Sequence, residues 1–235
     1  MHDKISIITV VYNDVEHIEK TIKSVISQNY PNIEYLIIDG NSSDGTLEKC
    51  KKYSERISKI VSEHDTGIYN AMNKGIKLAT GEWLFFLNSG DVFCDENVIS
   101  NVFKNENNAD IIYGKAITPD GKLCYYPQKI TKTMFIMERM ICHQAIFARK
   151  KTFFDNLFDE GYRIIADRVW LYKCLCAKKV VEKKNIIVSI YDTNGISSNK
   201  EKFDKESLRF LKEISRKFYY FGLLKRFFKN LIKKN

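Results

Sequence analysis

The segment SIITVVYNDVEHIEKTIKSVI (Ser6–Ile26) contains an apolar run followed by apolar residues at helical spacing. The run Ser6–Tyr12 is continuous and rich in β-branched residues, which is typical of a strand buried on both faces. Asn13 and Glu16 stand in the positions of a helical capping box. The apolar positions of the helix that they would cap are Ile18, Ile22, Val25 and Ile26. The segment therefore predicts a buried strand followed by an amphipathic helix.

The alternation of strand and helix continues as far as residue 88. Further strands are predicted at 34–40, 58–63 and 83–88. Ser43 or Asp44 can cap a second helix, whose inward face would be Leu47, Cys50, Ser54 and Ile57. A third helix is predicted within residues 67–81, with its inward face at Ile68, Ala71, Met72, Gly75, Ile76 and Ala79. Such alternation implies parallel strands with right-handed crossovers, which predicts an α/β fold with a Rossmann-like half and a mostly parallel central sheet.

The pattern becomes less regular after Asp95. Residues 109–117 and 122–128, separated by Asp120-Gly121, predict a β-hairpin. Residues 143–150 predict another strand, and residues 166–178 predict a helix. Because the sequence shows no clear linker or repeat, we expect one domain over residues 1–200, with halves 1–95 and 96–200, and an appended segment over 201–235.

Composition and charge narrow the class of protein. The chain has 235 residues, of which 44% are hydrophobic and 29% charged, as in globular proteins. Its formal charge is +9, and the seven Lys and Arg residues after Ile214 leave only +2 for the rest, which argues against a nucleic-acid-coating surface. The six cysteines show neither zinc spacing nor a disulfide framework, so we expect reduced thiols in a cytoplasmic protein. We expect neither a signal peptide nor a membrane span.

Polar residues follow each predicted strand of the first half. They are Asn13-Asp14, Asp39, Glu63-His64-Asp65 and the stretch Asn88–Asp91. Ligands of open α/β sheets bind beyond the carboxyl ends of the strands. Taken singly, Asp14, Asp44 and Asp65 could equally be helix caps. The glycine-rich phosphate-binding motifs are missing, so a bound nucleotide would need its charge met by a divalent cation held by carboxylates.

Five segments in order resemble the family 2 glycosyltransferases of bacterial surface-polysaccharide assembly, which have the nucleotide-sugar-binding GT-A fold. The segments are SIITVVYN, LIIDGNSSDGT, SEHDTGIYNAMNKGIKLATGEWLFFLNSGD, CHQAIFARK and RIIADRVWLYK. The resemblance covers roughly residues 4–198. It implies a nucleotide-sugar-binding half at 1–95 and an acceptor-binding half at 96–200.

The resemblance also implies roles for individual residues. Asp39 would contact the base and ribose of a nucleoside diphosphate, usually uridine, and Asp65 would line the base pocket. Asp91 would hold the divalent cation, Mg²⁺ or Mn²⁺, and Asp167 would be the catalytic base. The other residues expected at the donor nucleotide are Val11, Asn13, Asn73, Asn88 and Ser89. Without the motif, the preferred interpretation of Asp167 is an acid at a helix N-terminus, favoured by the helix dipole; with the motif, the preferred interpretation is the catalytic base.

Three further residues are expected near the diphosphate or the acceptor. They are His143 and Gln144 in the HQ pair, and Ser197 in GISSN, which could also be an ordinary turn. The sequence departs from the family at Asn88, where an acid often stands. Asn88 can hydrogen-bond a ribose hydroxyl or a metal-bound water, but it adds no charge.

These residues fit the chemistry of glycosyl transfer. A cation at Asp91 would neutralise the departing diphosphate, and a carboxylate can assist deprotonation of the acceptor hydroxyl. Direct displacement with one base would invert the anomeric centre. The expected function is an inverting glycosyltransferase that moves a sugar from a nucleotide-sugar donor, with UDP as the expected nucleotide, to a hydroxyl of a glycan or lipid-linked acceptor in cell-surface polysaccharide biosynthesis. Two other functions are possible alternatives. A sugar-phosphate nucleotidyltransferase would require a glycine-rich basic loop after the first strand, where this sequence has YNDVEH. A non-catalytic glycan-assembly protein would not need both Asp91 and Asp167.

The C-terminal segment carries apolar residues at three-to-four spacing from Leu208 to Leu231, with basic residues mainly between them. One interpretation is a helix packed on the domain with a solvated basic face. The other is an interfacial helix, with Phe and Leu in the headgroup region and Lys and Arg on anionic phosphate. The second interpretation would place the protein peripherally at the inner face of the cell membrane.

Overall fold

The computed structural model describes residues 2–139, 141–154, 156–193 and 199–232. The described strands are β1 (Ile5–Val11), β2 (Ile33–Asp39), β3 (Lys59–Ser62), β4 (Trp83–Phe86), β5 (Val92–Phe93), β6 (Ile111–Ile117), β7 (Ile146–Arg149) and β8 (Val181–Ile190). The α-helices are α1 (Ile18–Ile26), α2 (Thr46–Lys51), α3 (Ile68–Leu78), α4 (Val98–Val102), α5 (Lys132–Ile136), α6 (Ala166–Cys176), α7 (Lys200–Ile214) and α8 (Arg216–Ile232). Three short 3₁₀ turns are η1 (Ser54–Arg56), η2 (His143–Ala145) and η3 (Lys150–Phe153).

The described strands form one eight-stranded sheet in the order β3-β2-β1-β4-β7-β6-β8-β5. The four strands β3, β2, β1 and β4 are parallel, which confirms the predicted Rossmann-like half. Strand β7 is antiparallel to both β4 and β6, and it joins this half to the second part of the sheet. The sheet is therefore mixed, and the two halves of the chain share it instead of forming separate layers.

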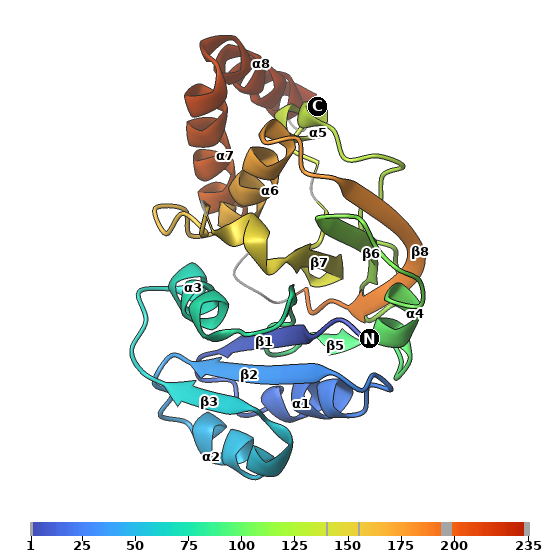
Figure 1. Cartoon of the computed structure of the whole chain (residues 1–235). Coiled ribbons are helices and arrows are strands. Elements are labelled where there is room, and N and C mark those ends of the chain that lie inside the picture. Colours follow the sequence, from blue (N-terminus) through green and yellow to red (C-terminus); the bar gives the residue numbers. More distant parts are fainter. Residues whose placement is uncertain (1, 140, 155, 194–198, 233–235) are drawn as a thin grey trace.

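Helices cover both faces of the sheet (Figure 1). One hydrophobic core contains residues of α3, α5, α6 and α7, and the other contains residues of α1, α2 and α4. Strand β1 lies between them and all seven of its residues are buried, as its β-branched sequence predicts. The burial of both faces is the reason why the strand shows no alternation of apolar and polar residues.

The predicted capping box before α1 is wrong. The helix begins at Ile18, its N-cap residue is His17, and no side chain caps it. Asn13 instead adopts a left-handed backbone with φ 47°, and its Oδ1 accepts a hydrogen bond from the amide of Ser43 at 2.9 Å. The second cap is closer to the prediction, because Asp44 Oδ1 accepts the amide of Thr46 at the start of α2 at 3.0 Å.

The second half of the chain differs more from its prediction. Strand β6 is present, but the predicted hairpin reduces to a turn and one antiparallel bridge between Ile117 and Leu123. The edge that this hairpin would have used is taken by β8, which runs parallel to β6. The strand at β7 and the helix at α6 are confirmed.

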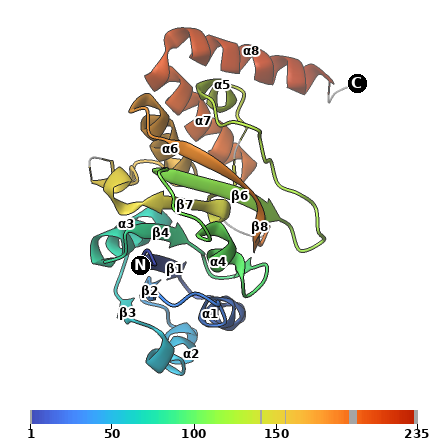
Figure 2. The same ribbon diagram turned by 45° about the vertical axis from the view of Figure 1, so that its right-hand side comes forward.

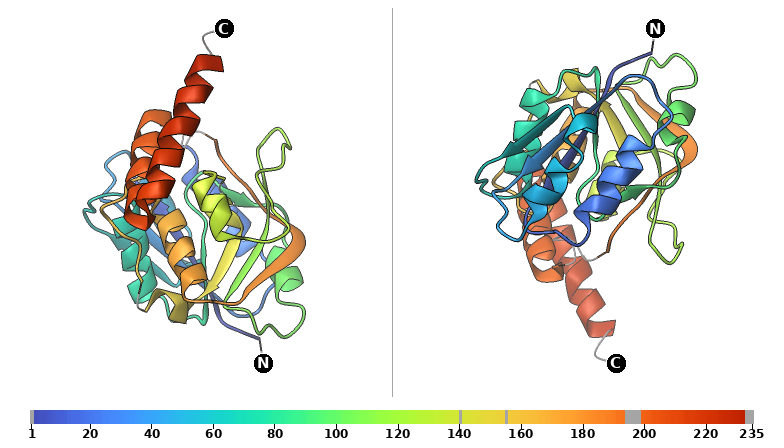
Figure 3. Two further views of the ribbon diagram at one scale, coloured as in Figure 1. Left: turned by 90° about the horizontal axis from the view of Figure 1, so that it is seen from above. Right: turned by 90° about the horizontal axis from the view of Figure 1, so that it is seen from below.

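The C-terminal segment forms two helices instead of one. Helix α7 packs on the domain through Phe210 and Leu211, which are 3% and 0% exposed. The chain bends at Ser215, and α8 projects beyond the rest of the molecule (Figures 2 and 3). No helix within the described residues is long and apolar enough to cross a membrane.

Helix α3 approaches the sheet closely at Gly75. A Cβ at this position would lie 2.5 Å from Ile8 Cγ2 of β1. Alanine gains about 1 kcal/mol of helix propensity, but the overpacking costs about 1–3 kcal/mol. We therefore expect Gly75→Ala to lower the free energy of unfolding, measured by urea denaturation. The exposed Lys77 on the same helix is the control, since Lys77→Ala should change little. Equal or greater stability of Gly75→Ala would contradict this packing.

Candidate active site

The carboxyl ends of β1, β2 and β4 meet at one edge of the sheet. Val11 and Asp39, the last residues of β1 and β2, are paired in register. The loop after β4 carries Asn88–Asp91, and the amide of Ser89 donates to the Val10 carbonyl at 3.2 Å. The structure thus brings together most of the polar residues that the sequence predicts for the site.

Asp39 is fully buried at this edge, and donors within the chain surround its carboxylate. Its Oδ2 accepts from the amide of Ser42 at 3.0 Å and from Ser62 Oγ at 2.6 Å. The hydroxyl of Ser42 donates to Oδ1. Asp39 therefore holds the loop after β2 against the end of β3, and its contact with a base and ribose stays a prediction.

Tyr12 is a residue of this edge that the sequence analysis did not identify. Its side chain is 64% exposed directly after β1. A Cβ at Gly40 would lie 3.2 Å from Tyr12 Cδ2 and 2.5 Å from Asp65 Oδ2, so Tyr12 and Asp65 flank this glycine. The Asp65 carboxylate is held by the Gly67 amide at 2.8 Å. An exposed ring beside a carboxylate suits a planar base with N–H groups. The side chain of Val11 is buried in the core, so only its backbone borders this place.

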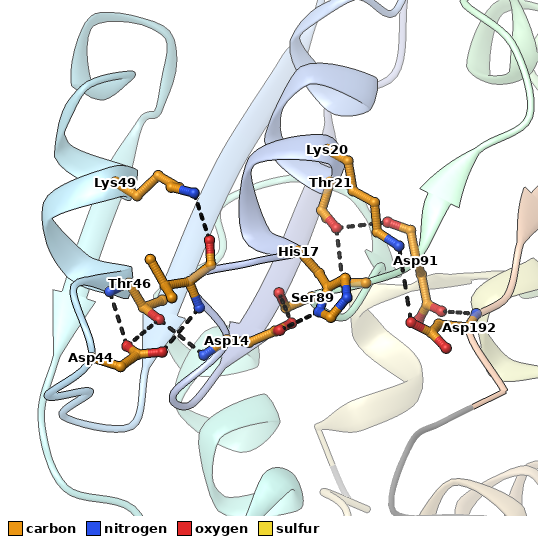
Figure 4. Close-up of polar contacts among 12 residues, drawn as sticks. Asp14, His17, Lys20, Thr21, Asp44, Thr46, Lys49, Ser89, Asp91 and Asp192 are labelled. Carbon is orange, nitrogen blue, oxygen red and sulfur yellow. Dashed lines mark hydrogen bonds and ion pairs between the residues drawn. The ribbon is translucent and has the colours of Figure 1, made fainter.

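Asp14 joins the loop after β1 to the loop after β4 (Figure 4). Ser89 Oγ donates to Asp14 Oδ2 at 2.6 Å, and His17 Nδ1 lies 2.6 Å from Asp14 Oδ1. The neighbouring Asn13 is exposed, and its amide donates to Ser42 Oγ at 2.8 Å. Ser89 and Asn13 thus lie at the same edge, in connected loops.

Asp91 is buried, with 3% of its surface exposed, and it connects three segments; Figure 4 shows its contacts with Thr21 and Asp192. Its Oδ1 accepts from the Asp192 amide and its Oδ2 from Gln144 Nε2, both at 2.8 Å. Its carbonyl accepts from Thr21 Oγ1 of α1 at 2.8 Å. Burial raises the pKa of Asp91 to about 6, although these hydrogen bonds and the charge of His143 lower it.

A second polar chain runs from Asn88 through His143 to Asp167. His143 Nε2 lies 3.1 Å from Asn88 Nδ2, and His143 Nδ1 lies 3.2 Å from Asp167 Oδ2. Asn88 Oδ1 is buried and has no hydrogen-bond partner among the described residues. This oxygen is therefore able to accept a hydrogen bond from a hydroxyl group of a ligand.

Asp167 stands in the first turn of α6, and its two oxygens have different surroundings. Oδ1 faces the Tyr69 hydroxyl at 3.0 Å and the Arg168 amide at 2.8 Å, whereas Oδ2 faces only His143 among the contacts described. Burial acts to raise the pKa of Asp167, but His143, the Arg168 amide and Tyr69 together hold it below its usual value. Asp167 is thus ionised and available as a proton acceptor at neutral pH.

One predicted residue, Asn73, has contacts outside these networks, and another, Ser197, cannot be placed relative to them. Asn73 is 3% exposed, and its amide holds the backbone of Phe158 and the carboxylate of Glu160, with contacts of 2.9–3.0 Å. Ser197 lies outside the described residues. The predicted donor role of Asn73 stays a prediction, and the contacts observed for it are structural.

The oxygen ligands near Asp91 fit a divalent cation. The charge of the Asp192 carboxylate contributes to the raised pKa of Asp91, and Figure 4 shows the two side by side. Hard carboxylate oxygens are the ligands that Mg²⁺ and Mn²⁺ prefer, and metal-binding carboxylates commonly accept hydrogen bonds as well. Across the described part of the chain, no group of three His, Cys, Asp or Glu residues could hold a metal ion. The other ligands would therefore come from a diphosphate and water.

Asp192 and Tyr69 were also not identified from the sequence. Asp192 comes shortly after the end of β8, so it belongs to the same pattern of acidic residues that follow the strands. That signal was missed because β8 itself was not predicted. Tyr69 lies in the first turn of α3 and is 5% exposed, so its pattern is that of an ordinary core residue.

The chain belongs to glycosyl transferase family 2, because the model of that family matches residues 6–161. A PGL/p-HBAD biosynthesis glycosyltransferase of Mycobacterium bovis is 29% identical over 212 residues, which cover 87% of this chain and 82% of the relative. The glycosyltransferase GlyA of Streptococcus pneumoniae is 32% identical over 116 residues, covering 48% of this chain and 16% of that protein. The protein is therefore a glycosyltransferase, as the motifs predict.

Solved structures confirm the GT-A glycosyltransferase fold. TarS of S. aureus superposes with a TM-score of 0.71 at 22% identity, over 90% of this chain and 39% of TarS. This chain thus spans well under half of TarS. A TarS fragment in complex with UDP-GlcNAc gives a TM-score of 0.67 at 16% identity, covering 90% of this chain and 65% of that fragment. The mannosyltransferase PcManGT from Pyrobaculum calidifontis, in complex with GDP-Man and Mn²⁺, gives 0.70 at 14% identity, covering 91% and 64%.

The raised pKa of Asp91 makes a prediction for stability against pH. Burial raises the pKa of Asp91 from 3.8 to about 6 on folding. Its contribution to the free energy of unfolding is therefore fully present below about pH 4 and is lost as the pH rises through about 6. In Asp91→Asn this titration is missing. Relative to that variant, the wild type should lose up to about 3 kcal/mol of unfolding free energy over this range.

Urea denaturation at a series of pH values measures this difference. The exposed Asp159 provides the matched control, and Asp159→Asn should follow the wild-type curve. Parallel curves for the wild type and Asp91→Asn would contradict the buried, ionisable state of Asp91.

Proposed function

We propose that the protein is an inverting glycosyltransferase that moves a sugar from a UDP-sugar donor to a hydroxyl of a glycan or lipid-linked acceptor in cell-surface polysaccharide or glycolipid biosynthesis. The observation that carries the proposal is the Asn88–His143–Asp167 chain beside the Asp91–Asp192 pair. A carboxylate whose pKa is held below its usual value, close to carboxylate oxygens suited to a diphosphate-bound cation, supports a mechanism with one base. Complexes of TarS with UDP and UDP-GlcNAc support the donor class.

The donor would lie along the edge formed by β1, β2 and β4. Tyr12 and Asp65 would bind the base, and the loops at Asn13 and Asp39 would approach the ribose. Asn88 and Ser89 lead from there toward Asp91, so the diphosphate would lie over this loop. The orphaned Asn88 Oδ1 supports this path, because a donor hydroxyl would satisfy it.

The two carboxylate oxygens of Asp167 would have different roles in catalysis. Oδ1 is held by Tyr69 and the Arg168 amide, which fix the orientation of the carboxylate. Oδ2 would take the proton of the acceptor hydroxyl as its oxygen attacks the anomeric carbon. The acceptor hydroxyl would replace or share the contact of His143 with Oδ2. Attack on the face opposite the diphosphate, with one base, inverts the anomeric configuration.

Asp91 and Asp192 would hold a divalent cation, Mg²⁺ or Mn²⁺, together with the donor diphosphate. When bound, the cation would supply Lewis-acid stabilisation of the negative charge on the departing diphosphate. Gln144 holds Asp91 Oδ2, and its neighbour His143 contacts the base. The adjacent residues His143 and Gln144 would thus position Asp167 and Asp91 relative to each other.

Asp167→Asn should separate catalysis from donor binding. Loss of the base should lower kcat by about 10²–10⁴-fold, while the thermal shift caused by the bound donor persists. The assay is transfer or hydrolysis over a panel of UDP-sugars with added Mn²⁺. The exposed carboxylate of Glu201 on α7 is the matched control, and Glu201→Gln should retain full activity. Unchanged turnover in Asp167→Asn under saturating donor would exclude Asp167 as the base.

We also propose that α8 contacts the membrane surface. Tyr220, Phe221, Leu223 and Leu224 are 66%, 45%, 38% and 58% exposed, so this turn of the helix is not covered by the domain. Two basic residues expected to face lipid, Lys225 and Arg226, instead pair with Glu138. The apolar side chains and the exposed Arg216 and Lys217 therefore carry the proposal.

Sedimentation with lipid vesicles tests this surface. Replacing Tyr220, Phe221 and Leu224 together by Ser should lower the partition coefficient on phosphatidylcholine–phosphatidylglycerol vesicles at least about tenfold, because their apolar area no longer enters the lipid. The pair Phe154→Ser and Val180→Ser, exposed at other places, is the matched control. Equal binding of both variants would contradict a role of α8.

A further inference from the structure

Two of the six cysteines are in contact beside the candidate active site. Cys124 follows the turn after β6, and its amide donates to the Ala116 carbonyl at 2.9 Å. Cys142 directly precedes the η2 turn, which carries His143 and Gln144. The two thiols share a side-chain hydrogen bond, and both side chains pack against the core that contains residues of α1, α2 and α4. Neither cysteine has a role in the proposed transfer.

The Cys142 thiol is the first member of a chain of hydrogen bonds that ends at Asp91. Cys142 Sγ donates to Gln144 Oε1 at 3.0 Å, and Gln144 Nε2 donates to Asp91 Oδ2 at 2.8 Å. Because the thiol faces the oxygen of the amide, the nitrogen of the amide is turned toward the carboxylate. Gln144 is 3% exposed, so solvent does not compete for either contact. The proton of the Cys142 thiol therefore fixes the orientation of the Gln144 amide at Asp91.

The hydrogen bond between the two thiols gives them opposite reactivities. It lowers the pKa of Cys124 to about 7, against the effect of burial, whereas both the bond and burial raise the pKa of Cys142 well above its usual value. Much of Cys124 is thus a thiolate at neutral pH, and the thiolate is the form that reacts with oxidants. The Cys124 side chain is also partly exposed, so a molecule as small as hydrogen peroxide can reach it. Cys142 keeps its proton and lies in contact with the sulfur that would be oxidised.

We propose that Cys124 and Cys142 form a peroxide-sensitive pair, whose oxidation to a disulfide releases the Gln144 amide and so weakens the site at Asp91. The Cys124 thiolate attacks hydrogen peroxide, a sulfenic acid forms, and the hydroxide that leaves takes up a proton as the first water. The Cys142 sulfur then attacks the Cys124 sulfur. The S–S bond forms, the S–O bond breaks, and the hydroxyl leaves with the Cys142 proton as the second water. The two thiols lose two electrons, which reduce the peroxide.

The disulfide has no proton to donate to Gln144 Oε1. A sulfur without its proton is only a weak acceptor, so the buried amide oxygen would face it without a partner, which is costly. If the amide rotates, Asp91 Oδ2 loses the donor that holds it. Loss of a hydrogen-bond partner of a metal-binding residue costs about 10–100-fold in metal affinity or activity. Since thiols are kept reduced in the cytoplasm and disulfides there are transient, the reduced pair would be the active state.

Peptide mapping without reductant tests the disulfide itself. Trypsin places the two cysteines in the peptides 123–129 and 140–149. After treatment with hydrogen peroxide, we expect one cross-linked species that is lighter than the sum of these peptides by two hydrogen atoms, and dithiothreitol should restore both peptides. Cys124→Ser should abolish the species, whereas Cys176→Ser, which removes an exposed thiol elsewhere, should not. A map in which Cys124 and Cys142 remain unpaired, or pair with other cysteines, would overturn the proposal.

The side-chain amide of Gln144 reports on the link to Asp91 without any donor. The chain has three glutamines, Gln28, Gln128 and Gln144, so labelling glutamine with ¹⁵N gives three pairs of side-chain resonances. Gln144→Asn assigns its own pair, because that pair disappears. We expect the disulfide to shift the Gln144 pair, with Gln28, whose amide donates to the Asp95 carbonyl at 2.6 Å, as the unchanged reference. A Gln144 pair that keeps its position in the oxidised protein would refute the link.

Binding of Mn²⁺ in the presence of UDP measures the consequence for the site, through the electron paramagnetic resonance of the free ion. This readout rests on the proposed function. The oxidised wild type should bind Mn²⁺ about tenfold or more weakly than the reduced protein. Cys124→Ser, shown to be folded by thermal unfolding, should bind equally well with and without peroxide.

The outcomes separate this proposal from the transferase proposal. Unchanged Mn²⁺ affinity in wild type that carries the disulfide would overturn the effect on Asp91. Absence of Mn²⁺ and UDP binding by the reduced wild type would instead count against the transferase proposal. In that case the peptide map and the Gln144 resonances still decide whether the cysteine pair oxidises and whether it releases the amide.

Discussion

The carboxylate of Asp91 accepts hydrogen bonds from the Asp192 amide and from Gln144, while its carbonyl accepts one from Thr21. These contacts join the loop after β4 to α1, to the η2 turn and to the end of β8. Because His143 is the neighbour of Gln144, the same contacts set the distance from His143 to Asp167. The arrangement has an energetic cost, since burial disfavours the charged form of Asp91. A bound cation would offset that cost, which links donor binding to the integrity of the site.

The parallel half of the fold could be predicted because its signals are local. Buried runs such as Ser6–Tyr12 and the helical stripe of α3 each specify one element, and short crossovers leave few topologies. The second half depends on pairing between distant segments. Strand β8 has exposed and half-buried residues, and it takes the position beside β6 that the hairpin would have used. Nothing in either segment alone indicates that choice.

The site likewise contains some residues that have a local sequence signal and others that are defined only by contacts between distant segments. Asp91, Asp167 and His143 follow strand ends or motifs, so their residue types indicate chemistry directly. Tyr12 and Tyr69 could not be recognised from the sequence, since one is an aromatic residue after a strand and the other resembles core. Asn73 shows that a residue inside a motif can also have a structural contact that the sequence does not indicate, because its amide holds the Phe158 backbone. The pairing of Lys225 and Arg226 with Glu138 likewise depends on tertiary contacts between residues far apart in sequence.

In the proposed reaction one carboxylate, Asp167, is the base in a direct displacement at the anomeric carbon of a nucleotide-sugar. Tyr69 and the Arg168 amide hold its Oδ1, and its Oδ2 contacts His143, so the carboxylate is oriented with one oxygen available to accept a proton. The most direct test is the anomeric configuration of the first product formed, read by ¹H NMR from the coupling constant of its anomeric proton. We expect a configuration opposite to that of the donor, and a product that retains the configuration of the donor would contradict direct displacement.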